Sequence, residues 1–229
     1  MARFLRAVRL RAPVDAGWPF DLPAVRALPS LRFDADATFL VGENGMGKST
    51  VVEAIAMAAG LNAHGGTRNL RTAGHGTESP LHTRLTLSWA RRPQRDFFLR
   101  AETFLDTVAA YERSGGRYAG LGRLSHGESV VELLSRLSGR GLLLLADEPE
   151  AGLSMTGQLA VLRRLHELVA EGAQLVCATH SPVLPALPGA RVYELHDEGV
   201  DEVAWDDTDA VVLLRSFLGS TDRYLDRLR

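Results

Sequence analysis

The chain has 229 residues, of which 45% are hydrophobic and 24% charged, and its formal net charge is −2. This near-neutral balance gives no global attraction to nucleic acid or to an anionic membrane, and the single cysteine, Cys177, excludes an internal disulfide. No apolar stretch reaches the roughly 18 residues that a membrane helix needs, so we expect a soluble, cytoplasmic α/β domain without membrane insertion.

Residues 3–11 alternate partly between apolar residues and arginine, which predicts an edge strand. Prolines and a glycine then interrupt residues 12–30, so this segment is expected to form a loop or short turns. Trp18 and Phe20 lie within it. Either ring could cover the core, and either could instead stack on an adenine bound by the stretch that follows.

The next stretch matches the pattern G-x-x-x-x-G-K-[ST] of a phosphate-binding loop. An apolar run at 38–41 leads into it as a short buried strand. A helical run follows from Ser49 to Ala59, with Gly60 as the expected helix stop. Strand, glycine-rich turn and helix are the context that the pattern requires. The loop residues are Gly42, Glu43, Asn44, Gly45, Met46, Gly47, Lys48, Ser49 and Thr50.

Glycines in this loop allow consecutive backbone N–H groups to turn inward toward phosphate, at the positive end of the following helix. Lys48 is expected to reach the β- and γ-phosphates, and the Ser49 hydroxyl to bind Mg²⁺. Lys48 is also the only lysine among the 26 basic residues of the chain. A thin ammonium fits a phosphate cradle in a way that a planar guanidinium does not.

Residues 61–80 are rich in glycine and polar residues and predict a long polar connection. The alternating run 81–90 and the run 95–104, separated by a turn, predict an antiparallel hairpin. A short helix is expected at 105–112.

The segment 124–137 begins with Leu-Ser-His-Gly-Glu-Ser and continues as an apolar-periodic helix. Ser125 and Glu128 have the spacing of a capping box, which places a helix start here. Taken alone, the segment is equally well explained as an ordinary capped helix.

Four consecutive leucines at 142–145 predict a strand buried on both faces. Asp147 and Glu148 follow at its end, and Pro149 is expected to hold Glu148 in an extended conformation. Asp147 is therefore a candidate for the second Mg²⁺ anchor, and Glu148 for the group that activates water. The alternative is a merely polar strand end.

The last third of the chain continues the alternation of helix and strand. Residues 154–171 form an amphipathic helix with Leu159, Leu162, Leu165, Leu168 and Val169 on one face, ended by Gly172. A buried strand at 174–179 carries His180 at its end, where a side chain points into a ligand crevice unless it is simply a surface histidine. A strand at 191–195, an acidic solvated stretch and a helix at 209–218 complete the chain.

Together, the phosphate loop, Leu124–Ser129, Leu142–Glu148 and Thr179–Ser181 resemble the motifs of the ABC-type ATPases. The likeness covers residues 36–196 and is strongest to their soluble branch, which includes chromosome-maintenance and recombination-repair heads and small stand-alone ATPases. It implies a P-loop NTPase fold of three αβα layers, with a mostly parallel sheet and an antiparallel β subdomain. Residues 1–229 are expected to form one such domain, without a transporter-type helical arm or a coiled-coil insertion.

The resemblance also implies a site shared by two copies packed head to tail, with ATP and Mg²⁺ between them. Asp147 would complete the Mg²⁺ shell with Ser49, Glu148 would act as the catalytic base, and His180 would contact the γ-phosphate. The helix start would cap that phosphate from the other copy of an ATP-dependent homodimer. Its residues are Ser125, His126, Gly127 and Glu128.

Two departures from the family pattern stand out. His126 replaces the first glycine of the usual Leu-Ser-Gly-Gly signature, and no glutamine fits the position that senses Mg²⁺ and water. Glu102 is the candidate substitute, with Gln94 as the alternative. We expect an Mg²⁺-dependent ATP hydrolase; a transporter subunit and a non-hydrolysing switch are the alternatives. No protein or nucleic-acid client is indicated.

Overall fold

The computed structural model describes residues 4–11, 17–28, 31–70, 79–115 and 117–226. The strands in these ranges are β1 (Leu5–Leu10), β2 (Ala37–Gly42), β3 (Leu85–Trp89), β4 (Arg95–Arg100), β5 (Leu142–Asp147), β6 (Gln174–Ala178), β7 (Arg191–His196) and β8 (Gly199–Val203). The α-helices are α1 (Pro23–Ala27), α2 (Lys48–Ala58), α3 (Phe104–Ser114), α4 (His126–Arg136), α5 (Met155–Glu171), α6 (Asp209–Gly219) and α7 (Thr221–Leu225).

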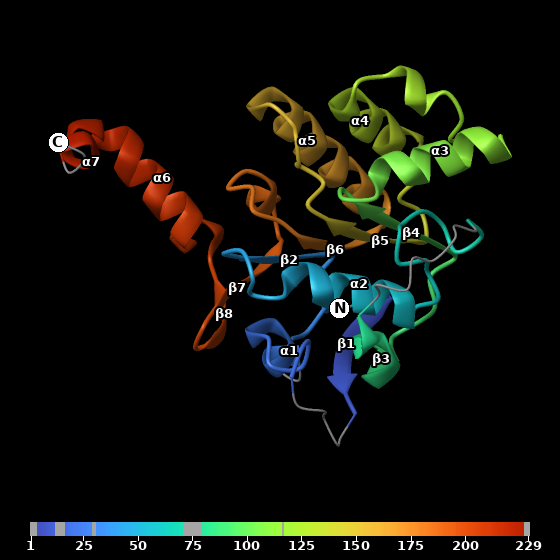
Figure 1. The fold of residues 1–229 in the computed structure, drawn as a ribbon, viewed down its shortest axis with the longest axis horizontal. Coiled ribbons are helices and arrows are strands. Elements are labelled where there is room, and N and C mark those ends of the chain that lie inside the picture. The colour runs from blue at the N-terminus through green and yellow to red at the C-terminus, as the bar shows by residue number, and fades with distance from the viewer. Residues whose placement is uncertain (1–3, 12–16, 29–30, 71–78, 116, 227–229) are drawn as a thin grey trace.

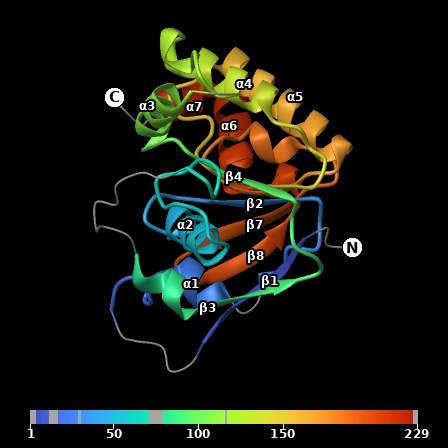
Figure 2. The same cartoon turned by 90° about the vertical axis from the view of Figure 1, so that its right-hand side faces the viewer.

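The central sheet has the strand order β4-β5-β6-β2-β7-β8. All neighbouring pairs run parallel except β7 and β8, which are antiparallel. Helices α3, α4 and α5 cover one face, and α2 with the small β1–β3 sheet lies against the other (Figures 1 and 2). This mostly parallel, layered α/β architecture with an antiparallel addition confirms the predicted fold class.

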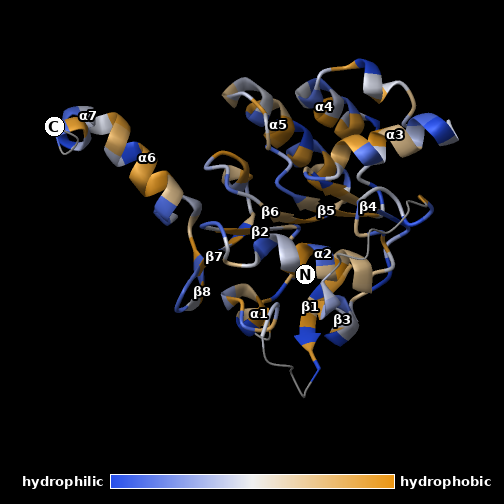
Figure 3. Ribbon diagram, viewed as in Figure 1, coloured by the Kyte–Doolittle hydropathy of each residue, from blue (hydrophilic) through white to orange (hydrophobic). Residues whose placement is uncertain are grey.

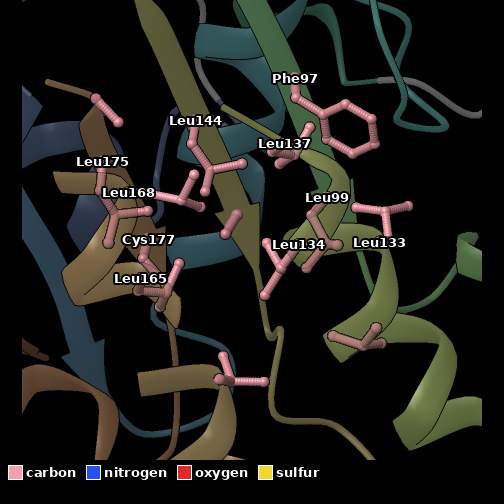
Figure 4. Packing of buried hydrophobic residues seen from close by; sticks show 14 of the residues in the cluster. Phe97, Leu99, Leu133, Leu134, Leu137, Leu144, Leu165, Leu168, Leu175 and Cys177 are labelled. Carbon is pink, nitrogen blue, oxygen red and sulfur yellow. The ribbon is translucent and has the colours of Figure 1, made fainter. Parts of the chain in front are cut away.

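Burial follows from strand composition. β5 is buried along its whole length, as its four leucines predict. On the helical face, Leu144 and Leu175 of the sheet meet Leu134, Leu165 and Leu168 of the helices (Figure 4). The other face packs Leu143, Val176 and their neighbours against α2 and β1 in a second apolar cluster. Cys177 is fully buried in the helical-face cluster, as expected of a small apolar side chain.

The predicted hairpin at 81–104 is wrong. β3 pairs antiparallel with β1, and β4 pairs in parallel with β5 at the edge of the central sheet. The composition of β4 explains this, because Asp96–Leu99 is continuously buried, as in a strand covered on both faces. Two alternating runs joined by a turn look the same in a sequence whether or not they pair. Residues 81–84 also belong to a 3-10 helix rather than to a strand.

Three further expectations change. The connection after α2 is partly packed, because Leu61, Ala63 and Leu70 are buried, while its residues 71–78 lie outside the described ranges. Leu159 of α5 is 52% exposed rather than on the buried face. The acidic stretch after β7 contains β8, where backbone pairing to β7 supports a polar strand.

Helix α6 extends away from the sheet and contains many hydrophobic residues (Figures 1 and 3). Leu213 and Leu218 are among the most exposed large apolar side chains described. No helix in the described ranges is long and apolar enough to cross a membrane.

Gln174, at the start of β6, connects the central sheet to β1. Its side chain is fully buried; Oε1 accepts hydrogen bonds from the N–H groups of Phe4 (3.0 Å) and Leu5 (2.8 Å). Nε2 donates to the carbonyl oxygens of Leu5 (2.8 Å) and Phe33 (2.6 Å). One amide thus replaces the backbone partner that the start of β1 would otherwise need.

We expect Gln174→Leu to lower the free energy of unfolding by about 3 kcal/mol or more, since it leaves several buried backbone groups without partners. Denaturant unfolding of the variant measures this loss. Gln94→Leu, at an exposed position just before β4, serves as the matched control. Equal midpoints for the wild type and Gln174→Leu would contradict the expectation.

Candidate functional site

The carboxyl ends of the parallel strands β2, β4, β5 and β6 meet at one edge of the sheet, where ligands bind in open α/β folds. β2 ends at Gly42, and the loop 42–47 then turns into α2. Gly42, Gly45 and Gly47 all have positive φ. A Cβ at Gly42 would overlap the Leu195 carbonyl, whereas one at Gly45 would meet open space. The loop therefore needs glycine at its base for packing and at Gly45 for its backbone conformation.

Gly47 caps α2 without any side-chain hydrogen bond. The N-terminus of α2 is therefore free of a competing side-chain acceptor, and its positive end faces the loop. Lys48 is only 3% exposed, and its Nζ donates to the carbonyl oxygens of Gly42 (2.8 Å) and Glu43 (2.7 Å). Burial lowers the pKa of Lys48 to about 8, and Glu148 and Asp147 oppose that shift. An anion bound beside Lys48 would oppose the effect of burial and favour the charged form of its amine.

Asp147 ends β5 and is 5% exposed. Burial raises its pKa to about 6, while a hydrogen bond from Ser49 lowers it. Its Oδ1 is buried without a hydrogen-bond partner among the described residues. The structure thus places Asp147 beside Ser49, as the sequence predicts, with one carboxylate oxygen left for a further ligand.

The raised pKa makes Asp147 a source of instability at neutral pH. The folded state binds the proton of Asp147 more tightly than the unfolded chain does. The free energy of unfolding therefore falls as the pH rises from about 4 to about 6, and it keeps this lower value above pH 6. A pKa difference of about two units between the folded and unfolded states corresponds to a loss of at most about 3 kcal/mol in the free energy of unfolding. We expect Asp147→Asn to melt at a higher temperature than the wild type at pH 7.5 without nucleotide, and the gap to shrink at pH 4.5.

Thermal denaturation at both pH values tests this expectation. Asp197→Asn, at an exposed position in the turn after β7, is the matched control. A lower melting temperature for Asp147→Asn at pH 7.5 would show that burial does not penalise this carboxylate.

Glu148 differs from the expectation in its backbone. Its φ is 51°, so it is left-handed rather than extended, and no other non-glycine residue in the described ranges has positive φ. Pro149 favours an extended conformation for Glu148, so the left-handed backbone goes against the local preference. The Glu148 N–H donates to Ala178 (2.9 Å), and its carbonyl accepts from Ala151 (2.9 Å), so the chain turns sharply here. Such strain is typical of functional sites.

His180 follows β6, and its Nε2 lies 3.3 Å from Glu148 Oε1. Both side chains are about one-third exposed, so they are open to a ligand. They line a pocket of about 290 Å³ together with the phosphate loop. Its lining residues are Trp18, Leu22, Asn44, Gly45, Gly47, Lys48, Ser49, Thr50, Glu148 and His180. Glu43 and Met46 line a neighbouring groove, which His180 also reaches.

The two aromatic residues that could stack on an adenine differ in their exposure to solvent. Phe20 is 6% exposed and belongs to the core. Trp18 is 63% exposed and lines the pocket, so it is the aromatic available for stacking. The sequence left these two alternatives open for both residues.

Neither candidate for the missing glutamine faces this pocket. Glu102 is 74% exposed in its side chain and pairs with Arg100 (2.7 Å). Gln94 precedes β4 beside Gly141, at the opposite end of the strand from the site. Arg100 instead ends β4 in register with Asp147, with its Nε 4.0 Å from Asp147 Oδ2, and it pairs with Glu53 of α2 (2.5 Å).

Sequence reasoning missed Arg100. The signal was its place at the carboxyl end of a strand, but that signal needs β4 to be assigned to the central sheet. The hairpin interpretation removed it from consideration.

The helix start at Ser125 has the predicted capping box. Ser125 N donates to Glu128 Oε2 (3.0 Å), and Glu128 N donates to Ser125 Oγ (3.4 Å). His126 packs edge-on against Phe104 (5.2 Å between ring centroids). A Cβ at Gly127 would lie 2.9 Å from Leu153, so the glycine allows α4 to approach the segment before α5.

Residues 125–128 line a separate groove between α4 and α5. This groove shares no lining residue with the phosphate-loop pocket. Within one chain, the structure therefore does not bring the helix start to the phosphate loop. The groove of about 750 Å³ is open on the surface.

The residues at the pocket fit a nucleoside triphosphate with Mg²⁺. The glycine cradle, the buried ammonium and the open helix N-terminus suit phosphates. Ser49 and the unpartnered Asp147 oxygen suit a hard cation. In the described ranges, no group of three His, Cys, Asp or Glu side chains could hold a metal ion. Bound Mg²⁺ would thus rely on phosphate and water oxygens as well.

Comparison with known proteins gives distant relatives. No protein-family model matches the sequence. A protein of Methanothermobacter marburgensis named as an ABC transporter ATP-binding protein is 33% identical over 94 residues, covering 38% of this chain and 34% of that protein. One of Rhizobium meliloti, named as a ribose/galactose/methyl galactoside import ATP-binding protein, is 28% identical over 181 residues, or 68% of this chain and 36% of that protein.

This chain therefore spans about a third of the length of these curated relatives. Among solved structures, CbiO1 from Clostridium perfringens, part of the ABC transporter complex CbiONQ, aligns with a TM-score of 0.50. Sequence identity is 13%, with 93% of this chain and 95% of that one covered. That likeness shows a shared fold.

Proposed function

We propose, from the premise that this chain is an ABC-type P-loop ATPase, that it binds ATP with Mg²⁺ and hydrolyses it. The names of the sequence relatives support ATP binding. The observation that carries the proposal is that Lys48, Glu148 and His180 line one pocket with Ser49, whose hydroxyl bonds Asp147. We take residues 1–229 as one domain of this kind.

The proposed chemistry follows from the positions of these side chains. Lys48 would hold the β- and γ-phosphates, and Ser49 with Asp147 would hold Mg²⁺, which supplies charge neutralisation on the phosphate oxygens. Glu148 would orient a water molecule and accept its proton as the water oxygen bonds to the γ-phosphorus and the bond to ADP breaks. His180, 3.3 Å from Glu148, would donate a hydrogen bond to the γ-phosphate.

We further propose that the complete site forms between two copies. The support is geometric, because the Ser125–Glu128 helix start is a solvent-facing helix N-terminus in a groove apart from the phosphate loop. A second copy would bring that positive helix end to the γ-phosphate as a cap. A single copy would then hydrolyse ATP slowly.

The test is the dependence of activity on protein concentration. Phosphate release with ATP and Mg²⁺ should rise more steeply than in proportion to protein, and specific activity should level off once the dimer dominates. Specific activity that is constant at every concentration would contradict the shared site. Absence of Mg²⁺-dependent release at any concentration would contradict the ATPase itself.

A second candidate is the ATP-binding subunit of a membrane transporter. The names of the relatives favour it, since both refer to transport proteins. Purification of the tagged chain from its source membranes separates the two functions, because a transporter subunit would bring a membrane-embedded partner with it.

A further inference from the structure

A carboxylate that the proposed mechanism does not use lies two residues after Glu148. Glu150 is 8% exposed, and its Oε1 accepts hydrogen bonds from Thr179 Oγ1 (2.6 Å), His180 N (2.7 Å) and Ser181 N (3.1 Å). One oxygen thus holds the backbone of the whole segment that follows β6. The chain would otherwise leave β6 with two consecutive N–H groups unpaired by the sheet.

The same segment is tied on its other side to α5. Ser181 Oγ donates to Oε1 of Gln158 in α5 (2.7 Å). Within the segment, Ser181 N also donates to Thr179 Oγ1 (2.9 Å). His180 lies between these two anchors, and its ring extends to Glu148. The direction of the imidazole therefore depends on a backbone that Glu150 holds.

Holding this segment with Glu150 carries a free-energy cost, because the carboxylate is buried. Its Oε2 is buried without a hydrogen-bond partner in the described part of the chain. Burying a carboxylate costs more than burying a neutral amide, which could accept the same hydrogen bonds. What the charge adds is strength, because charge-assisted hydrogen bonds are shorter and about twice as strong as neutral ones. Such bonds suit a segment that must not move.

We propose that Glu150 is the positioning residue for His180. It fixes the backbone of residues 179–181 so that the imidazole stays beside Glu148, at the place where the γ-phosphate would lie. The inference rests on the proposed function, since it assigns Glu150 a part in the hydrolysis at that site. It adds that the two strand ends, after β5 and after β6, are locked to each other through one carboxylate.

The experiment is a double-mutant cycle of Glu150→Ala and His180→Ala, read as kcat and KM for ATP. Because a misplacement of about 1 Å can cost up to 100-fold, Glu150→Ala should lower kcat at least about tenfold. KM should change less than about threefold, since the phosphate loop supplies the affinity. Adding Glu150→Ala to His180→Ala should cause no further loss.

Two variants complete the set. Glu150→Gln keeps an acceptor oxygen but makes only neutral hydrogen bonds, so its kcat should lie between those of Glu150→Ala and the wild type. Glu171→Ala is the control, because Glu171 also accepts a backbone N–H, from Gly139 (2.7 Å), but at the far end of α5. If Glu150→Ala does not fold, Glu150→Asp, which keeps the charge but is one methylene shorter, takes its place in the cycle with the same expectation.

Multiplicative losses in the double variant, or an unchanged kcat in Glu150→Ala, would overturn the positioning role. So would no recovery in Glu150→Gln. Failure of the proposed function gives a different pattern, because the wild type itself would then show no Mg²⁺-dependent phosphate release.

Discussion

Replacing Glu148 with glutamine is expected to abolish ATP hydrolysis and to trap an ATP-bound dimer. Glutamine keeps the size and the hydrogen-bonding oxygen of Glu148 but cannot take a proton from water, so kcat should fall at least about 100-fold. ATP affinity should remain, because Lys48 and the loop glycines are unchanged. The removal of a negative charge beside the γ-phosphate should even favour the bound state.

Light scattering with ATP and Mg²⁺ should show Glu148→Gln as a dimer and, without nucleotide, as a monomer. Glu198→Gln, an exposed glutamate in the turn after β7, is the matched control and should behave as the wild type. A variant that stays monomeric with saturating ATP would remove the shared site from the proposal. One that hydrolyses ATP at the wild-type rate would remove Glu148 from its role as base.

Replacing Lys48 with alanine is expected to weaken ATP binding by about 100-fold or more. Two charge-assisted contacts to phosphate are worth at least about 3 kcal/mol together, which corresponds to this factor in Kd. The side chain already lies in the cradle, bonded to the Gly42 and Glu43 carbonyl oxygens, so its site needs little rearrangement. Calorimetric titration with ATP measures the loss.

Lys48→Arg provides the sharper comparison. A guanidinium is planar and wider than an ammonium, so it should fail to replace Lys48 although it keeps the charge. Affinity should also depend on pH in the wild type. Because burial lowers the pKa of Lys48 to about 8, the free protein loses this charge as pH rises past 8, and ATP binding should weaken there. Unchanged affinity in Lys48→Ala would defeat the assignment of the phosphate loop.

Some features of this site follow from short stretches of sequence. The loop 42–50 is recognisable because backbone angles that only glycine adopts easily, one ammonium and one hydroxyl must come in fixed order. The capping box at Ser125 and Glu128 is equally local, since its two hydrogen bonds close within one helical turn. Four adjacent leucines reveal β5 because only a strand covered on both faces needs them.

Other features depend on which distant segments meet. Gln174 bonds Phe4 and Leu5 across some 170 residues of chain. Arg100 comes beside Asp147 only because β4 joins β5. Glu150 holds the segment after β6 only because β5 and β6 are neighbours. Each pattern is ordinary in sequence, and its meaning appears only with its partner.

The amino-acid sequence by itself thus determined the glycine-rich loop at 42–50, the carboxylate pair at 147–148 and the α/β class, since each is visible in residues close in the chain. The tertiary structure alone decided the partner of β4, the left-handed turn at Glu148, the exposure of Trp18 and the hydrogen bonds of Glu150. The physical reason is that strand pairing is set by the total burial of a sheet, and any apolar strand has several partners that would satisfy its local preferences equally well.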